Sequence, residues 1–111
     1  MMDHPISSPS RLTELVDYQP DSVVSRVIMR NPGATLTVFA FAEGQGLSEH
    51  SNPNDAVILV LEGTVNVVID GTDHVVASGE ALHLPPSIPH ELLGGAPFKM
   101  LLSLLKKPKE S

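Results

Sequence analysis

The alternation of side chains along the chain predicts a succession of short β-strands. In the segment 35–41, Leu36, Val38 and Ala40 fall on one face and threonine and phenylalanine side chains on the other. The segment 57–61 is apolar at every position, which is typical of a strand covered on both faces. Further apolar runs bring the total to eight or nine strands. The clearest are expected at 23–29, 35–41, 57–61, 65–69, 74–77, 82–84, 90–93 and 98–105.

Turn residues separate these strands at short intervals. Asp70 and Gly71 give the strongest turn signal, because both residues tolerate the positive φ angles of a type I′ hairpin. Ten prolines and eight glycines in 111 residues also favour an all-β chain over a helical one. Since so many short strands leave many edges, closure into a barrel or a two-sheet sandwich is expected.

Only the segment before the first strand has a helical pattern. Ser10 is a candidate N-cap for a short turn over 11–17, where Leu12, Leu15 and Val16 fall on one face. A chain of 111 residues has the size of one domain. We therefore expect three parts, namely an N-terminal arm with a short helical turn over 1–21, one barrel over 22–105 and a basic tail over 106–111.

Composition narrows the function classes. The absence of cysteine excludes disulfides, thiolate metal sites and cysteine nucleophiles. The net charge of −6 disfavours nucleic acid as a partner, since a phosphate backbone would be repelled. The N-terminus lacks the pattern of a secretion signal, and no apolar run approaches the roughly 20 residues needed to span a bilayer. We therefore expect a cytoplasmic protein with no membrane partner.

Two histidines, His50 and His90, occupy similar frames on either side of the predicted hairpin. Each follows a glycine-punctuated stretch and lies beside an apolar strand. If strand pairing folds both inward onto one barrel mouth, their imidazoles line a pocket for a small ligand. Asn52 and Ser48 share the parity of His50, so an extended segment would turn them to the same pocket. We therefore predict a ligand-binding set of His50, Asn52, His90 and Ser48, and we assign no catalytic residue.

Six residues of the chain stand at defined intervals, namely Gly44, His50, Gly63, Gly79, Pro85 and His90. Five residues separate Gly44 from His50, and Gly63 closes this first stretch. Five residues also separate Gly79 from Pro85, and His90 follows. This spacing resembles the two motifs of the cupin family, whose members are small RmlC-like barrels of the double-stranded β-helix type. The resemblance covers about residues 23–105 and implies an all-β fold, a small jelly-roll barrel.

The chain departs from the family pattern at the positions that hold metal. The second histidine of the first motif falls on Asn52 and its glutamate falls on Ala56, whereas a glycine of the second motif falls on Ser87. Of the four ligands that the resemblance implies, only His50 and His90 are kept. The metal site therefore looks eroded, and we expect either no metal or a weakly bound divalent ion such as zinc, iron, manganese or nickel.

Two residues are candidates for a third metal ligand. Asp55 lies one position from the lost glutamate, in a loop-like stretch where strand parity is relaxed. His83 lies between Leu82 and Leu84, and alternation alone does not decide which of these side chains faces inward.

The first functional hypothesis is a stand-alone cupin that binds a small polar ligand around His50 and His90. The alternative is a metal-dependent cupin enzyme, such as a dioxygenase, isomerase or lyase, that uses both histidines and a third ligand. Metal-free acid–base catalysis by the histidine pair, and a scaffold with a filled cavity, also remain open. Because 57–61 and 98–105 are apolar on both faces, we expect a homodimer.

Overall fold

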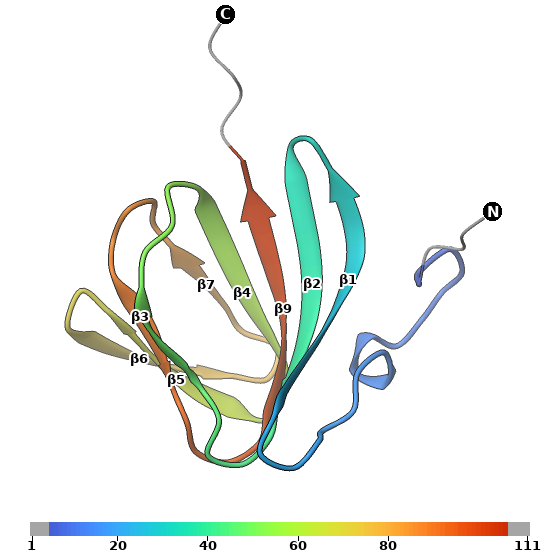
Figure 1. The fold of residues 1–111 in the computed structure, drawn as a ribbon, viewed down its shortest axis with the longest axis horizontal. Helices are drawn as coiled ribbons and strands as arrows, with labels where there is room; N and C mark the ends of the chain where they lie inside the picture. The colour runs from blue at the N-terminus through green and yellow to red at the C-terminus, as the bar shows by residue number, and fades with distance from the viewer. Residues whose placement is uncertain (1–4, 107–111) are drawn as a thin grey trace, which may run out of the picture.

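The computed structural model describes residues 5–106, in which nine strands form two antiparallel sheets facing one another (Figure 1). The larger sheet has the order β1-β2-β9-β4-β7 and the smaller one β3-β8-β5-β6. This is the predicted all-β jelly roll. The strands are β1 Val23–Asn31, β2 Ala34–Phe41, β3 Leu47–His50, β4 Asp55–Glu62, β5 Thr64–Ile69, β6 Thr72–Ala77, β7 Ala81–Leu84, β8 His90–Leu93 and β9 Phe98–Leu105.

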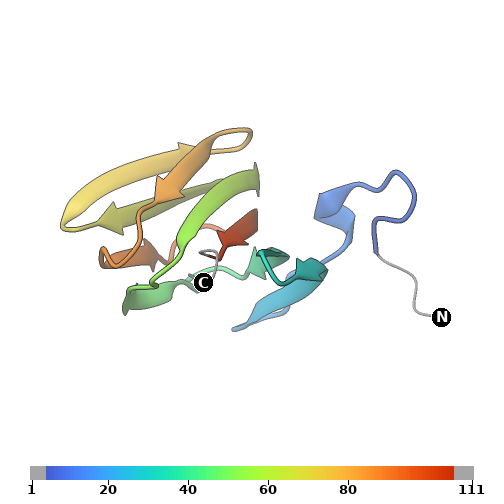
Figure 2. The same cartoon turned by 90° about the horizontal axis from the view of Figure 1, so that it is seen from above.

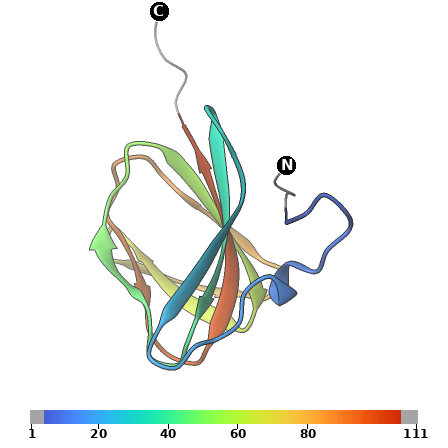
Figure 3. The ribbon, with the colours of Figure 1, turned by 45° about the vertical axis from the view of Figure 1, so that its right-hand side comes forward.

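Seen from above, the two sheets form two layers, and the N-terminal segment lies outside them, beyond β1 and β2 (Figure 2). The sheets meet at one end of the barrel and diverge toward the end from which the chain leaves β9 (Figures 1 and 3). The loop between β3 and β4 lies at this wider end. Within residues 5–106 there is no helix long and apolar enough to cross a membrane.

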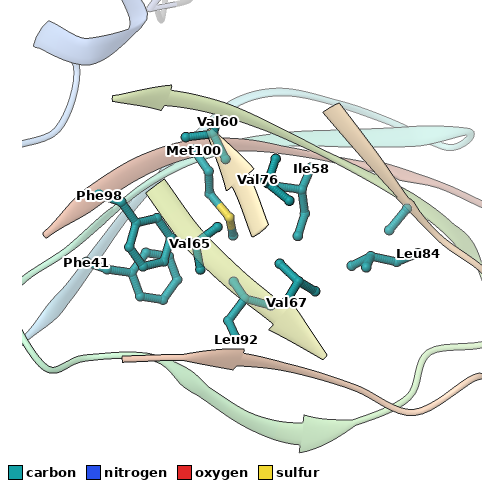
Figure 4. Close-up of a cluster of buried hydrophobic side chains, with 11 residues drawn as sticks. Phe41, Ile58, Val60, Val65, Val67, Val76, Leu84, Leu92, Phe98 and Met100 are labelled. Atoms are coloured by element: carbon teal, nitrogen blue, oxygen red, sulfur yellow. The ribbon is translucent and has the colours of Figure 1, made fainter. Parts of the chain in front are cut away.

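The main core fills the space between the sheets near the end where they meet. Its largest side chains include Phe41 and Phe98, whose stacked rings have centroids 4.4 Å apart (Figure 4). Alternation along β4 explains its continuous apolar sequence. Ala56, Ile58 and Val60 are buried between the sheets, whereas the residues between them face outward.

A second, smaller cluster covers part of the outer face of the larger sheet. Val38 and Ala40 of β2 are fully buried there, together with Ile28 of β1 and Val16 of the N-terminal segment. The alternation predicted for 35–41 is therefore correct, because Phe39 and Phe41 pack on the main core instead. Two opposed apolar faces explain why β2 carries no charged residue.

The N-terminal segment contains less helix than predicted. One 3-10 turn, η1, spans Leu12–Glu14, and no side chain caps it. The predicted Ser10 cap is wrong, since its hydroxyl donates to the backbone carbonyls of Ser8 and Pro5. The predicted hairpin is correct, with φ angles of 47° at Asp70 and 80° at Gly71. The predicted basic tail lies outside the described residues except for its first residue.

A buried lysine connects the N-terminal segment to the larger sheet. Lys99 of β9 is only 7% exposed, and its Nζ donates to the carbonyl of Thr13 at 2.6 Å. The same Nζ lies 4.9 Å from the centre of the Tyr18 ring. The Tyr18 hydroxyl donates to a carboxylate oxygen of Glu62 at 2.6 Å. Burial, together with the hydrogen bond and charge of Glu62, raises the Tyr18 pKa far above its usual value.

Candidate functional site

Strand pairing brings His50 of β3 directly opposite His90 of β8. Between the pair Leu47–Leu92 and the pair His50–His90, β3 advances three residues while β8 advances two. The extra residue is a β-bulge, which breaks the alternation of β3. As a result Leu47 and His50 both line the same cavity although they are an odd number of positions apart.

The two imidazoles approach through the same ring atom. Their Nε2 atoms are 3.1 Å apart, and the rings meet edge to face with centroids separated by 4.4 Å. Each Nδ1 contacts a backbone carbonyl, that of Ser48 at 2.7 Å for His50 and that of Ile88 at 3.2 Å for His90. Because a carbonyl oxygen only accepts, each Nδ1 donates in its bond, and the contact between the two Nε2 atoms is a hydrogen bond when one of them carries a hydrogen.

The two histidines differ in exposure. His90 is only 5% exposed, whereas His50 lies at the surface. Burial lowers the pKa of His90, an effect partly opposed by the hydrogen bond to Ile88 and reinforced by His50. Burial therefore favours the neutral form of the His90 imidazole.

Below the imidazoles lies a pocket with a volume of about 60 Å³. By the space that one buried water needs, this corresponds to about four water molecules. Eight apolar side chains and four polar ones line it, and they come from both sheets and the β3–β4 loop. They are Leu47, His50, Asn52, Asn54, Ala56, Ile58, Leu84, His90, Leu92, Met100, Leu102 and Leu104.

The other two predicted ligand-binding residues, Asn52 and Ser48, differ in whether they line the pocket. Asn52 lines the pocket, and its Oδ1 accepts hydrogen bonds from the backbone and side-chain nitrogens of Asn54 at 2.8 and 3.0 Å. Ser48 is exposed and does not line the pocket; its carbonyl orients His50 instead. Parity counted back from His50 fails because Ser48 lies within the stretch, between Leu47 and His50, where the register shifts. Sequence reasoning also missed Asn54.

The structure does not bring Asp55 or His83 to the imidazoles. His83 pairs in register with Val57, on the outer face of the larger sheet, and its neighbour Leu84 points into the pocket. The His83 Nε2 lies 2.6 Å from Oδ1 of Asp55. These two side chains therefore contact each other, on the opposite side of the sheet from the pocket.

The donor set fits a divalent metal only in part. Two nitrogen ligands at about 2.0–2.1 Å from one ion lie about 2.8–3.4 Å apart, and the Nε2 separation is within this range. Nowhere in residues 5–106 do three or more histidine, aspartate or glutamate side chains converge on one point. Two imidazoles would therefore hold an ion weakly, with the remaining positions left to solvent, an amide oxygen or a bound molecule.

The rim of the pocket carries one strained residue. Ser87 has a φ of 60°, in the left-handed region that favours glycine, and it stands where the cupin motif has glycine. Its backbone nitrogen donates to the carbonyl of Asn52 at 2.7 Å. This bond joins the β7–β8 connection to the β3–β4 loop and fixes the distance between two parts of the rim.

Two antiparallel sheets that face one another, with a pocket and two histidines between them, define a small β-barrel of the jelly-roll type. The profile of the cupin domain matches residues 37–104, and the chain belongs to the cupin family. A search of the curated proteins finds no match.

Solved structures agree with this assignment. A conserved protein of unknown function from Streptococcus pyogenes is 31% identical over 97% of this chain and 93% of its own, with a TM-score of 0.87. A cupin 2 conserved barrel domain protein from Leptotrichia buccalis is 37% identical over 85% of this chain and 46% of its own (TM-score 0.81). A cupin superfamily protein from Desulfitobacterium hafniense is 25% identical, covering 93% of this chain and 94% of its own (TM-score 0.86).

Proposed function

We propose that this cupin binds a small polar ligand in the pocket below His50 and His90, and that it holds metal weakly or not at all. The observation that carries the proposal is the pair of imidazoles, with Nε2 atoms 3.1 Å apart, on a pocket lined mostly by apolar side chains. Apolar walls with a few convergent polar groups are the usual composition of a small-molecule site.

Filling the pocket tests this proposal. Leu104→Phe adds volume inside the cavity, whereas Leu105→Phe adds the same volume on the outer face of β9. In an NMR screen of small polar compounds, we expect hits that shift pocket resonances of the unaltered protein and of L105F but not of L104F. The proposal fails if no compound shifts those resonances, or if L104F retains the hits.

Elemental analysis tests the second part of the proposal. After dialysis against a chelator at neutral pH, we expect far less than one equivalent of iron, zinc, nickel or manganese per chain. An ion retained at one equivalent would contradict weak binding.

A second candidate, a metal-dependent cupin enzyme, is favoured by one observation. The Nε2 separation suits two adjacent ligands of one ion, which would supply Lewis-acid chemistry when bound. His50 and His90 would hold it, and the apolar walls would exclude water from the bound substrate. Zinc titration followed by calorimetry should then give a site that His50→Ala removes and His83→Ala keeps; equal affinity in both variants would exclude it.

We further propose that two copies associate through the uncovered part of the larger sheet. Leu105 is 47% exposed, and Val57, Leu59 and Ser103 are half-buried on the same face. Light scattering should give a dimer, which Leu59→Glu dissociates. Val75→Glu, on the other sheet, is the matched control. A monomeric parent protein would contradict this proposal.

A further inference from the structure

The outer face of the smaller sheet is left open by the N-terminal segment, which lies beyond β1 and β2 (Figure 2). Along β5, β6 and β8, alternate residues point into the barrel, and Val67, Val76 and Leu92 are buried in the main core. The residues between them therefore face outward. We call them the acidic face, which consists of Asn66 and Val68 of β5, Asp73 and Val75 of β6, and Glu91 and Leu93 of β8.

One row of the acidic face is mainly aliphatic. Asn66 pairs with Leu93 on one side and with Val75 on the other, so the three side chains form a line across the strands. Leu93 is 37% exposed and Val75 is 69% exposed, and they are two of the four large hydrophobic residues that are exposed within residues 5–106. Contact with an apolar partner would remove both side chains from water, which favours association.

The neighbouring row is acidic. Val68 pairs with Glu91 on one side and with Asp73 on the other. Two strand spacings, about 9.4–9.8 Å, separate the backbones that carry the two carboxylates. The exposed Asp70 at the β5–β6 turn adds a further negative charge.

No basic side chain offsets these carboxylates within the smaller sheet. The lysines and arginines of residues 5–106 lie in the N-terminal segment, in β1, in β9 or directly after β9. They are Arg11, Arg26, Arg30, Lys99 and Lys106. A cationic partner would therefore meet negative charge and no like charge on the strands of this sheet.

We infer that the acidic face docks a basic amphipathic helix of another protein. Seven residues of a helix rise about 10.5 Å, so basic residues two turns apart match the separation of Glu91 and Asp73. Leucines beside them would cover Leu93 and Val75, as amphipathic helices cover sheet faces in layered folds. The inference goes beyond the proposed function, because it concerns the side of β8 that faces away from the pocket.

Other occupants fit this face less well. Nucleic acids and anionic membranes carry the same sign of charge as Glu91 and Asp73. A second copy bound by twofold symmetry would place its own acidic face against this one, and the carboxylates would repel.

Synthetic peptides test the inference on the full chain. The probe is a fluorescein-labelled peptide of two heptads of leucine and lysine in an amphipathic helical pattern, and the reference peptide has glutamate at every lysine position. Fluorescence anisotropy at low ionic strength measures the Kd, and amide resonances locate the site. We expect the lysine peptide to bind at least about tenfold more tightly than the glutamate peptide and to shift resonances of β5, β6 and β8. Added salt should weaken this binding.

Four variants at exposed positions separate the acidic face from the rest of the surface. Asp73→Lys should weaken binding of the lysine peptide about fivefold. Asp17→Lys, in the N-terminal segment, changes the net charge equally and should weaken binding less than about twofold. Val75→Ser should weaken binding about threefold. Val27→Ser, which also removes an exposed valine but from β1, should leave the affinity unchanged.

Three results overturn the inference. The first is that the lysine peptide fails to bind, or binds no more tightly than the glutamate peptide. The second is equal weakening by Asp73→Lys and Asp17→Lys, which would mean that net charge alone governs binding. The third is self-association of the chain that Val75→Ser abolishes, which would assign the acidic face to a second copy. The proposed function is tested separately, since none of these variants alters a residue that lines the pocket.

Discussion

Two polar clusters, one outside the barrel and one inside it, differ in what surrounds them. On the outer face of the larger sheet, Lys99 donates to the carbonyl of Thr13 and Tyr18 donates to Glu62, and neither contact belongs to the pocket. Inside, His50 and His90 of the smaller sheet contact each other through Nε2, and both line the pocket. A polar cluster that joins two segments of the chain stabilises the fold, whereas one that lines a cavity is suited to a ligand.

The largest expected effect is on the outer cluster. Lys99→Ala removes a charged hydrogen bond and the packing of the lysine stem, so the free energy of unfolding should fall by about 3 kcal/mol. Urea denaturation measures the change. Lys106→Ala, at an exposed position, is the control and should change stability by less than about 0.5 kcal/mol. Equal effects of the two variants would mean that Lys99 does not hold the N-terminal segment.

A smaller effect of opposite sign is expected at the pocket rim. Ser87→Gly should raise the free energy of unfolding by about 0.5–1 kcal/mol, because glycine tolerates a φ of 60° but loses more backbone entropy on folding. The melting temperature measures this. Ser78→Gly, at an exposed position without positive φ, should not stabilise the protein. A loss of stability in Ser87→Gly would show that the left-handed conformation carries no strain.

The inner cluster should also make stability depend on pH. The pKa of His90 lies below 6.5, so the unfolded chain binds more protons than the folded one as pH falls below that value. The free energy of unfolding should therefore be constant above about pH 7 and decrease below about pH 6.5. Denaturation curves between pH 7.5 and about pH 5.5 measure the slope. His90→Phe should flatten it, and an unchanged slope in that variant would assign the dependence to other groups.

The smallest effect on stability is expected at His50. His50→Ala removes an exposed side chain from a short edge strand, so stability should change by no more than about 0.5 kcal/mol. Thermal denaturation measures this. A loss as large as that of Lys99→Ala would make the histidine pair a structural feature, and the contrast between the two clusters would disappear.

Much of the fold could be predicted because its pattern is local. Alternation over 35–41 and the turn at Asp70–Gly71 each depend on neighbours in sequence, and both are correct. The intervals from glycine to histidine identified the family before any contact was known, and the cupin profile over 37–104 agrees. The sequence does not predict whether His83 or Leu84 faces the interior, because alternation in so short a strand does not indicate which face is buried.

The rest depends on contacts between distant segments. The bulge in β3 has no sequence signature, so parity turned Ser48 toward the pocket when in fact the residue contributes only its carbonyl. Nothing near Lys99 indicates that the segment around Thr13, 86 positions away, lies over it. The position of Lys99 between Phe98 and Met100 does indicate that its ammonium group contacts either solvent or a polar partner, since a charged residue within an apolar strand needs one of the two.

The bulge in β3 allows His50 to share the inward face of Leu47 although the two are three positions apart. Regular alternation over the same three positions would turn the imidazole out of the barrel, whereas deleting one position between them would remove the bulge and keep both side chains inward. In a lineage of such proteins, this half of the site can therefore survive the loss of a codon, an event that comparisons restricted to substitutions would overlook.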